Sequence, residues 1–410
     1  MFISDLHIHS RYSRATSKEC TPEHLDLWSR RKGIDILGTG DFTHPAWREE
    51  LKEKLERAES GLYTLKKDFR LKDDTPGVKT DPRFVITGEI SSIYKKNGKV
   101  RKVHSVILLP SIETAELFAK KLEAIGNIHS DGRPILGLDC HDLLEIMLET
   151  CPDAIYIPAH IWTPHFSLFG AFSGFDTIEE CFEDLTPHIH ALETGLSSDP
   201  PMNWRLSALD GYQLISNSDA HSPAKLGREA NLMDIELSYE GLSGAIQEGK
   251  GLAGTIEFFP EEGKYHYDGH RKCHLCLSPK EAEPYNGKCP VCGRKLTIGV
   301  SHRVEQLADR EDGYILKNAC PYESLVPLPE VIAASTGRSA ASVKVQKDYM
   351  EMLKKLGPEF LILRETPVED IKKAAGFLIS EGINRLRKGE VERIPGYDGE
   401  YGKVKLIDDS

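Results

Sequence analysis

Two histidines stand one residue apart close to the N-terminus, in the stretch SDLHIHS that begins at Ser4. Side chains alternate between the two faces of a strand, so His7 and His9 are expected to point to the same face. A second pair with the same spacing, Asp219 and His221, stands in the stretch SDAHS. Imidazole and carboxylate groups crowded on one face are typical of sites for zinc, manganese or iron. The two pairs therefore predict a metal site.

Further potential ligands stand at the ends of apolar runs that read as strands. A single histidine in such a place is more often a structural residue than a ligand, but a set of this size is hard to explain in that way. We therefore expect a centre with more than one metal ion. Its predicted ligands are His7, His9, Asp41, Glu89, His104, His160, Glu193, Asp219 and His221.

The chemistry expected of such a centre is hydrolysis of phosphoesters. Clustered cations activate a bound water, hold phosphate oxygens and stabilise the leaving group, so no Ser or Cys nucleophile is needed. Zinc suits the mixed ligand set, and Mg²⁺ or Mn²⁺ could also serve in catalysis. The sequence has no G-x-x-x-x-G-K-[ST] motif, which excludes a P-loop ATPase.

A second metal site is predicted from a C-x₂-C-x₁₂-C-x₂-C pattern. Two such pairs close a tetrahedral zinc site with no open position, which indicates a structural role. The predicted ligands are Cys273, Cys276, Cys289 and Cys292. The surrounding residues 264–303 hold eight Lys or Arg against three acidic residues, although the whole chain has a net charge of −12. This local excess of positive charge favours contact with nucleic acid.

The elements that must position these residues alternate in type over the first 260 residues or so. Seven β-rich runs are separated by helical patterns, and GLAGTIEFF is a possible eighth strand. Such alternation predicts a parallel sheet, open or closed into a barrel, whose active site lies at the C-terminal strand ends. His104 is an exception, because it lies early in its run. Helices are expected after Thr21 and from Ser111 to Gly126, and residues 50–83 read as a helix followed by an exposed loop.

Length and composition fit a protein of more than one domain. The chain has 410 residues, of which 40% are hydrophobic and 28% charged. No apolar run is long enough for a membrane span and no signal peptide is visible, so we expect a cytoplasmic protein without membrane contact. Boundaries near 262 and 300 divide the chain into a metal-dependent domain at 1–262, a zinc module at 263–300 and a helical domain at 301–410, which the family resemblance described below implies to be DNA-binding.

The motifs HIH, GDF, GE, H, H and the closing DAH resemble those of the polymerase and histidinol phosphatase (PHP) family over about residues 1–260. The resemblance implies a distorted seven-stranded (β/α)₇ barrel that hydrolyses phosphoesters with up to three metal ions, and Glu89 as a bridging ligand. Asp41 and His160 would take part in catalysis. The family often has another ligand shortly after the first pair, where this chain has Arg14 and Ala15. Glu193 is expected to complete the third position or to act as a base.

The order of parts, a PHP domain, a four-cysteine module and a helical tail, resembles the endonuclease Q family. The resemblance implies a DNA repair endonuclease that cuts on the 5′ side of a deaminated base (uracil, hypoxanthine or xanthine) or an abasic site, with the base flipped into a pocket. Single- or double-stranded DNA would be the partner. The pocket is expected at Trp162, Phe166, Phe169 and Gly195. The expected phosphate contacts are Lys272, Arg294, Lys295, Arg338, Lys344, Lys347, Arg385 and Arg387.

Two other functions remain open at this stage. One is a small-molecule phosphatase, of the histidinol phosphate kind, with an accessory zinc module. The other is a binding protein whose metal site has lost its activity. A sliding clamp is a possible partner of a repair enzyme, but no clamp-binding box is present at the C-terminus, and we expect a monomer.

Overall fold

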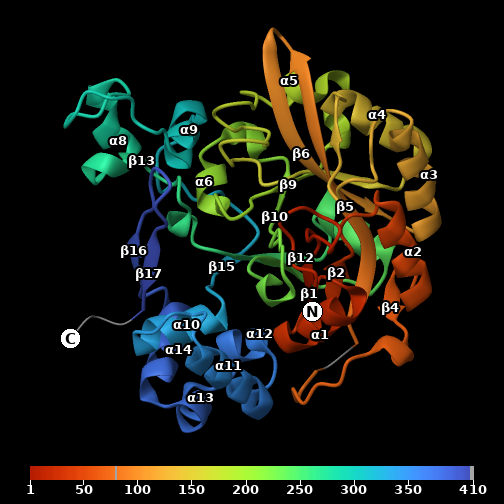
Figure 1. The fold of residues 1–410 in the computed structure, drawn as a ribbon. Helices are drawn as coiled ribbons and strands as arrows, with labels where there is room; N and C mark the ends of the chain where they lie inside the picture. Colours follow the sequence, from red (N-terminus) through yellow and green to blue (C-terminus); the bar gives the residue numbers. More distant parts are fainter. Residues whose placement is uncertain (79–80, 407–410) are drawn as a thin grey trace.

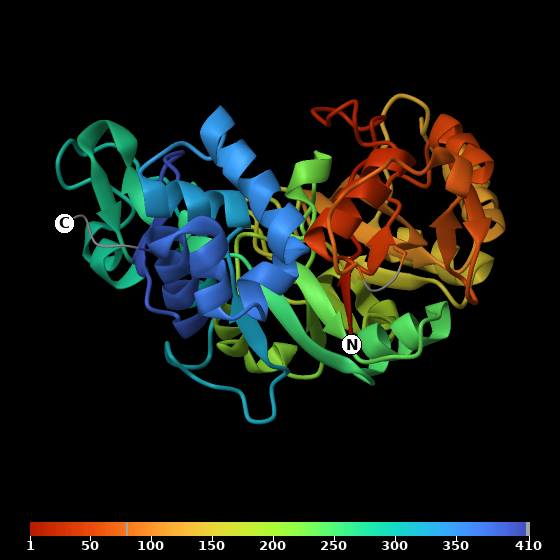
Figure 2. The same cartoon turned by 90° about the horizontal axis from the view of Figure 1, so that it is seen from below.

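The structure is a computed structural model, and it describes residues 1–78 and 81–406. A barrel forms the larger part, with a small module and a helical domain both on one side of it (Figure 1). Seen from below, the helical domain and the small module lie together at one end of the molecule and the barrel at the other (Figure 2). Among the described residues, no helix has both the length and the apolar character to cross a membrane.

Seven strands form the barrel. They are β1 (Phe2–Asp5), β2 (Ile36–Gly38), β5 (Arg83–Lys96), β6 (Lys99–Leu109), β8 (Ile155–Pro158), β9 (Ala191–Glu193) and β10 (Gln213–Ile215). Parallel pairing joins β1 to β2, β2 to β5 and β9 to β10. The chain beyond β1 closes the circle through a parallel bridge between Ile8 and Ala220. The predicted α/β barrel is confirmed, together with a helical C-terminal domain.

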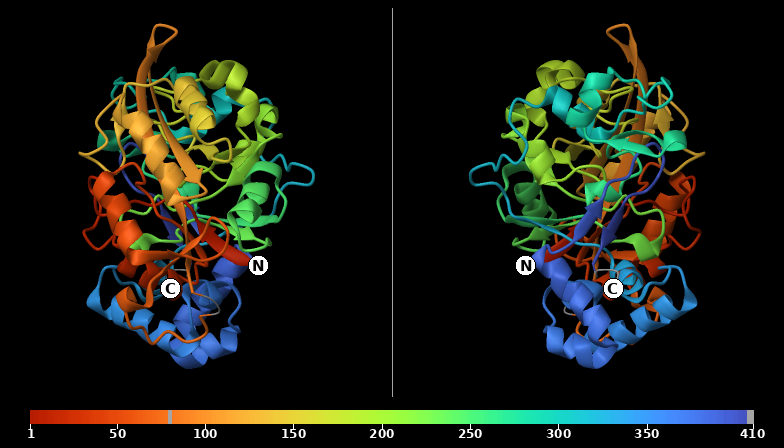
Figure 3. Two further views of the ribbon diagram at one scale, coloured as in Figure 1. Left: turned by 90° about the vertical axis from the view of Figure 1, so that its right-hand side faces the viewer. Right: turned by 90° about the vertical axis from the view of Figure 1, so that its left-hand side faces the viewer.

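One barrel strand departs from the expected parallel order. β6 runs antiparallel to both β5 and β8. Its first half therefore lies at the edge where the parallel strands end, which explains why His104 is early in its run. β5 and β6 together make a long hairpin that projects from the barrel (Figure 3). Antiparallel pairing thus brings His104 to the same edge as the other predicted ligands.

Further strands extend the sheet beyond the barrel. β11 (Ala230–Met233) pairs with β1 and with β12 (Leu252–Glu257), which is the possible eighth strand and runs antiparallel to β11. β15 (Tyr322–Ser324) pairs with β12. The region expected to be an exposed loop contains a hairpin instead, because Leu55, Tyr63 and Leu65 are buried. Its strands, and one more that pairs with β5, are β3 (Leu55–Arg57), β4 (Tyr63–Leu65) and β7 (Ile135–Leu136).

Helices pack around the barrel, two of them after Thr21 and Ser111 as predicted, whereas the helix expected from residue 50 begins at Pro45 and ends at Lys54. The first begins at Pro22 after Thr21 and ends at Gly33, which has a left-handed backbone. Another begins after Ser111, whose hydroxyl accepts a hydrogen bond from the N–H of Thr114. The set is α1 (Pro22–Lys32), α2 (Pro45–Lys54), α3 (Ile112–Glu123), α4 (Cys140–Thr150), α5 (Glu179–Phe182), α6 (Pro200–Trp204) and α7 (Tyr239–Glu248).

The module predicted to bind zinc is small. It contains β13 (Asp268–His270), β14 (Leu275–Leu277) and α8 (Pro279–Ala282), and α9 (Val300–Leu307) follows it. A hairpin near the end of the chain, β16 (Glu392–Ile394) with β17 (Lys403–Lys405), rises from the helical domain towards this module (Figure 1). A bridge between Tyr267 and Tyr397 joins the two.

The helical domain consists of α10 (Leu328–Thr336), α11 (Val343–Leu356), α12 (Glu359–Arg364), α13 (Val368–Ala375) and α14 (Phe377–Lys388). The pattern over 368–390 reads as one helix, but the structure divides it at Gly376, whose φ is 89°. This domain docks on the barrel through a buried ion pair, in which Lys32 Nζ lies 2.7 Å from Glu359 Oε2. Tyr349 donates a 2.7 Å hydrogen bond to the same carboxylate. The buried charge of Glu359 is therefore well paired.

Candidate metal centre

The predicted ligands gather into two groups that share Glu89. One group is His7, His9, Glu89 and Asp219, and the other is Glu89, His104 and His160; the ligand atoms of each lie within 4.8 Å of one another. Glu89 Oε2 lies 3.1 Å from His9 Nε2, and Oε1 lies 2.5 Å from His104 Nδ1 and 3.1 Å from His160 Nε2. The two oxygens of one buried carboxylate therefore face two sets of imidazoles, which suits a carboxylate shared by two ions.

His7 gives the clearest indication that the centre suits a cation. Its Nε2 is buried and has no hydrogen-bond partner. The nearest carboxylate oxygens, on Glu89 and Asp219, lie 3.5 and 3.6 Å away. A buried polar atom without a partner costs free energy, and a metal ion between these groups would remove that cost. The residues present thus fit a bound divalent ion.

Glu193 lies behind His7 rather than among the ligands. Its oxygens lie 3.1 and 3.0 Å from His7 Nδ1, and they also accept hydrogen bonds from the N–H of His160 and the amide of Asn217. Each oxygen of the Glu193 carboxylate thus has two partners within the protein. A carboxylate in this position fixes the tautomer and orientation of a metal-binding imidazole. The structure brings Glu193 against His7 and into neither group of ligand atoms, and its role as a third-metal ligand or as a base stays a prediction.

Asp41 has the same relation to His9. Its Oδ1 lies 3.1 Å from His9 Nδ1. Its Oδ2 accepts hydrogen bonds from Ser10 N, Ser10 Oγ and Ser13 Oγ at 2.7, 2.6 and 2.8 Å. The residues after the first histidine pair, where a ligand seemed to be missing, thus supply serines that hold Asp41. The structure does not bring Asp41 into either group of ligand atoms.

His221 stands at the margin of the centre. Its ring is 4.4 Å from the ring of His9, and its Nδ1 lies 2.8 Å from the carbonyl oxygen of Asp219. About a third of its side chain is exposed, as for Asp219. His221 belongs to neither close group, yet its position leaves it able to meet a cation or a substrate from the open side.

The backbone at three site residues is unusual. Asp41, His160 and Asp219 have φ angles of 52°, 31° and 48°. Such values are uncommon for residues other than glycine, and they cluster at functional sites in proteins. Position 195 requires glycine, because a Cβ there would lie 2.4 Å from His160 Cβ. Gly195 therefore lies directly against His160.

Arg133 is a site residue that no sequence pattern indicated. Its Nη1 lies 3.0 Å from Glu89 Oε2, and about a quarter of its side chain is exposed. A guanidinium beside this carboxylate partly neutralises the centre, and it can also pair with phosphate oxygens. Arg133 stands alone in a loop, so only the fold reveals its place.

Electrostatics follow from burial and from the crowding of carboxylates. Burial opposes protonation of His7, yet Glu193, Glu89 and Asp219 together raise its pKa well above the usual value. Burial lowers the pKa of His104 to about 4, although Glu89 acts in the opposite direction. Burial would raise the pKa of Glu89, but the neighbouring imidazoles hold it well below its usual value. The centre thus keeps its carboxylates ionised, as metal ligands must be.

The aromatic residues expected to form a base pocket have different roles. Trp162 and Phe169 are buried and pack 5.0 Å apart, and Trp162 donates its N–H to Asn203. They belong to the core beneath the loop. Phe166 is half-buried and lies 4.8 Å from the ring of His104. Phe172 is 58% exposed and stacks on His165 at 4.5 Å, so these two rings are the accessible ones.

Most of the basic residues expected to contact phosphates are exposed. They are Lys272, Arg294, Lys295, Arg338, Lys344 and Lys347. Lys344 and Lys347 pair with acidic residues one turn along their own helix. Arg385 pairs with Glu381. Arg387 is not available, because its guanidinium donates to the carbonyls of residues 362, 363 and 366 at the end of α12.

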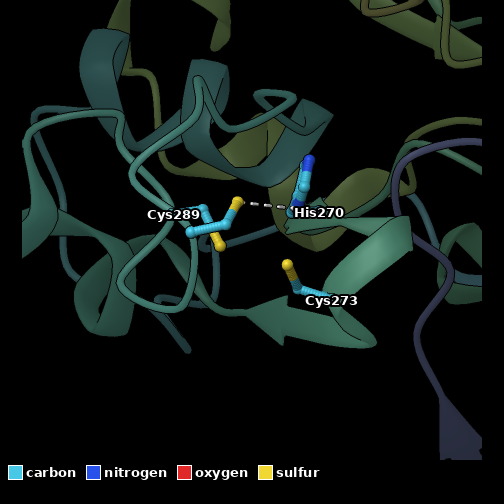
Figure 4. Close-up of side chains that lie close together, drawn as sticks. His270, Cys273 and Cys289 are labelled. Carbon is cyan, nitrogen blue, oxygen red and sulfur yellow. Dashed lines mark hydrogen bonds between the residues drawn. The ribbon is translucent and has the colours of Figure 1, made fainter.

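The four predicted zinc cysteines are not all together. Cys273, Cys289 and Cys292 lie close to His270, with their ligand atoms within 4.8 Å of one another (Figure 4). Cys276 is outside this group, and its Sγ lies 4.0 Å from the carbonyl oxygen of Pro395. The pattern of cysteines predicted three of the grouped residues and missed the histidine.

Comparison with known proteins places this geometry in context. Residues 327–390 match the family model described as the MJ0043 C-terminal domain. The uncharacterized protein MJ0043 of Methanocaldococcus jannaschii is 34% identical over 284 residues, which are 66% of this chain and 35% of that protein. This chain therefore spans about a third of the length of that relative. The uncharacterized protein YqxK of Bacillus subtilis is 28% identical, with 98% of each chain covered.

Two solved structures resemble the whole chain. One is the lesion-specific endonuclease PfuEndoQ from Pyrococcus furiosus, with a TM-score of 0.86 and 29% identity, covering 100% of this chain and 96% of that one. The other is endonuclease Q bound to a 27-mer duplex with an abasic lesion at its active site, with a TM-score of 0.85 and 29% identity. It covers 100% of this chain and 97% of that one.

Proposed function

We propose, on the premise that this chain resembles endonuclease Q along its whole length, that it is a metal-dependent endonuclease acting on damaged DNA. The observation that carries the proposal is the pair of ligand groups sharing Glu89 at the end of the barrel. A barrel with this centre can hydrolyse a phosphodiester without a protein nucleophile. The solved complex of endonuclease Q with a lesion duplex supports DNA as the substrate.

The residues of this chain would have three roles in the reaction: holding the ions, orienting the metal-binding imidazoles and contacting the phosphate. Bound divalent ions would activate water and offset charge on the phosphate. His7, His9, His104, His160, Glu89 and Asp219 would hold those ions. Glu193 and Asp41 fix the rings of His7 and His9, so that each presents Nε2 to the centre. Arg133, held beside Glu89, would meet a non-bridging phosphate oxygen.

The loop after β8 carries the residues that we expect to recognise the lesion. We infer incision on the 5′ side of deaminated bases (uracil, hypoxanthine or xanthine) and of abasic sites, with the damaged nucleotide turned out of the duplex. The exposed pair of His165 and Phe172 supports this, because such rings can stack on a base. Phe166 lies against His104 and would border the flipped nucleotide. Trp162 and Phe169 would stabilise the loop from below.

The zinc module and the helical domain would contact the phosphates of the DNA backbone. Lys272, Arg294 and Lys295 are exposed on the module, and Arg338 is exposed after α10. Both parts lie on one side of the barrel (Figure 2). Phosphate contacts release counterions, so affinity should fall steeply as salt rises. A binding constant that does not change with salt would argue against these contacts.

A panel of labelled substrates tests the proposal. Duplexes of one sequence carrying deoxyuridine, deoxyinosine, an abasic site or no lesion are incubated with the protein and Mg²⁺, Mn²⁺ or Zn²⁺. We expect nicks only in the lesion strands, with product ends that map to the 5′ side of the lesion. A small phosphate monoester is the parallel substrate. Rapid turnover of that ester with no nicking of any duplex would favour the phosphatase instead.

A further inference from the structure

We propose that a cleft beside the hairpin of β5 and β6 binds a phosphate of the DNA backbone, with Lys99 and Arg101 as its cationic contacts. This inference rests on the proposed function. It adds the barrel itself to the zinc module and the helical domain as a surface that contacts the backbone. The phosphate lies outside the bond that is cut, since the metal centre would hold the phosphate at that bond.

The tip of this hairpin, which projects from the barrel (Figure 3), is strongly basic in a chain whose net charge is −12. Residues 95–102, KKNGKVRK, hold five Lys or Arg and no acidic residue. The register sets Lys96 directly opposite Lys99, and like charges in such a place destabilise a hairpin. Lys96 is compensated by Asp139 and Glu183. Within the described ranges no carboxylate oxygen lies within 4.0 Å of Lys99 Nζ, so its charge is available to an anionic partner.

Arg101 is a buried cation whose contacts in the protein are neutral. Its side chain is only 6% exposed, and its Nε has no hydrogen-bond partner. The guanidinium lies 4.1 Å from the centroid of the Phe175 ring and donates to the carbonyl oxygen of Gly174. Among residues 1–78 and 81–406, no carboxylate forms an ion pair with it. Burying a charge without a counter-charge costs free energy, and an anion in the cleft would offset that cost.

The cleft lies between the hairpin and the loop after β8 and has a volume of about 710 Å³. Lys99 and Arg101 both line it, and they share a face of β6 because they are two residues apart. Two acidic side chains also line it, and both have partners. Asp176 pairs with Arg303, and Glu180 accepts a hydrogen bond from the N–H of Asp176. The charge that remains without a partner in the cleft is therefore positive.

Strand β6 links the cleft to the metal centre at a fixed distance. Arg101 and His104 are three residues apart, which spans about 10 Å along a strand. Successive phosphates of one DNA strand are about 3.4 Å apart along the duplex axis, so the bound phosphate would lie about three nucleotides from the cut. The loop is fixed to β6, because the N–H of Lys102 donates to Ser173 O and that of His104 to Phe166 O. Two anion sites at a fixed separation suit a polymer of phosphates.

Variants of the full-length protein test the two cationic contacts. Binding of a labelled duplex with one abasic site is followed by fluorescence anisotropy at several salt concentrations, with Ca²⁺ as the only added divalent ion. Lys99→Ser and Arg101→Met should each weaken binding about 5–10-fold. Each should also reduce the slope of log affinity against log salt by about 0.9, the value for one phosphate contact. Lys67→Ser is the matched control, because this exposed lysine follows β4, which pairs with the start of β5 at the opposite edge of the barrel.

Neutral methylphosphonate linkages, placed one at a time along the damaged strand, locate the phosphate. A linkage within about four nucleotides of the cut should weaken binding by the native protein. The same linkage should have no further effect on Lys99→Ser, because the contact is already lost. In parallel incision assays with Mn²⁺, Lys99→Ser should raise KM and leave kcat unchanged, as expected of a contact remote from the reacting bond.

Two results would overturn this inference. One is unchanged affinity and salt dependence in both variants, each shown to be folded by thermal unfolding. The other is a loss of affinity from methylphosphonate that adds fully to that of Lys99→Ser at every position. A duplex that is bound by the native protein but never cut would refute the proposed function instead, and the binding comparison would still decide whether the cleft holds a phosphate.

Discussion

Glu193→Gln is the substitution that most sharply tests how the imidazoles are held. In the native site, His7 Nδ1, the N–H of His160 and the amide of Asn217 all point at this carboxylate. The NH₂ group of a glutamine must face at least one of these donors. Asn217 cannot turn its oxygen towards it, because that oxygen already accepts from Leu6 N and from Asn231. A buried donor thus loses its acceptor, and His7 loses its orienting charge.

The expected size of the effect follows from that loss. Changing a residue that orients a metal ligand typically lowers metal affinity or activity by about 10–100-fold. This range corresponds to about 1.4–2.8 kcal/mol. Calorimetric titration of the metal-free protein with Mn²⁺ measures the affinity, and incision of an abasic duplex measures activity. Glu59→Gln, which removes the charge of a glutamate paired with Arg83 away from the centre, is the control.

Two outcomes would refute this reasoning. An affinity within twofold of the native value, in a folded protein, would mean that Glu193 does not position His7. Complete loss of binding, equal to that of His9→Ala, would mean that Glu193 is itself a ligand. Thermal unfolding must accompany both measurements, so that a folding defect is recognised.

Three further predictions concern other residues. Burial raises the pKa of Glu257 to about 8, whereas the unfolded state releases this proton near the usual pKa of about 4.3. The free energy of unfolding should therefore fall as the pH rises between these two values. In urea unfolding, Glu257→Gln should show a shallower decline of that free energy with pH. Arg387→Ala leaves carbonyls of α12 without a donor and should lower the free energy of unfolding by about 2–3 kcal/mol. Lys388→Ala, at an exposed position, should leave the stability unchanged. Weaker DNA binding of Arg387→Ala without a change in stability would contradict this prediction. Arg133→Met should lower kcat of incision by about 10²–10³-fold without weakening metal affinity, because a positive charge beside Glu89 is removed. An unchanged kcat would exclude a phosphate contact.

The sequence predicted much of the centre because strand alternation and strand ends are local features. His7 and His9 share a face, as their spacing requires, and Glu89 lies between two sets of imidazoles. Position at a strand end does not reveal which atom of a side chain points where. Asp41 and Glu193 were for that reason expected among the ligands, although each lies behind an imidazole. The partner of Glu193 is His7, far away in the sequence, and only the closed barrel brings them together.

Other differences have equally physical causes. Arg133 lies in a loop with no motif, so nothing in the sequence marked it. Apolar spacing continues through Gly376, but a backbone with φ of 89° ends one helix there and begins the next. Trp162 and Phe169, expected in the base pocket, are buried in the structure, because an aromatic residue in a loop can pack into the core as well as bind a ligand. His270 precedes Cys273 by three residues, and the fold brings its ring beside three of the cysteines.

The most direct measurement is incision of a duplex with one abasic site by metal-stripped protein, before and after a divalent ion is returned. The native protein should show no nicking without the ion and a single nick at the lesion with it. Glu89→Gln, folded as judged by thermal unfolding, should remain inactive with Mg²⁺, Mn²⁺ or Zn²⁺. Nicking by the metal-stripped native protein, or full activity of Glu89→Gln, would contradict a metal centre built on this shared carboxylate.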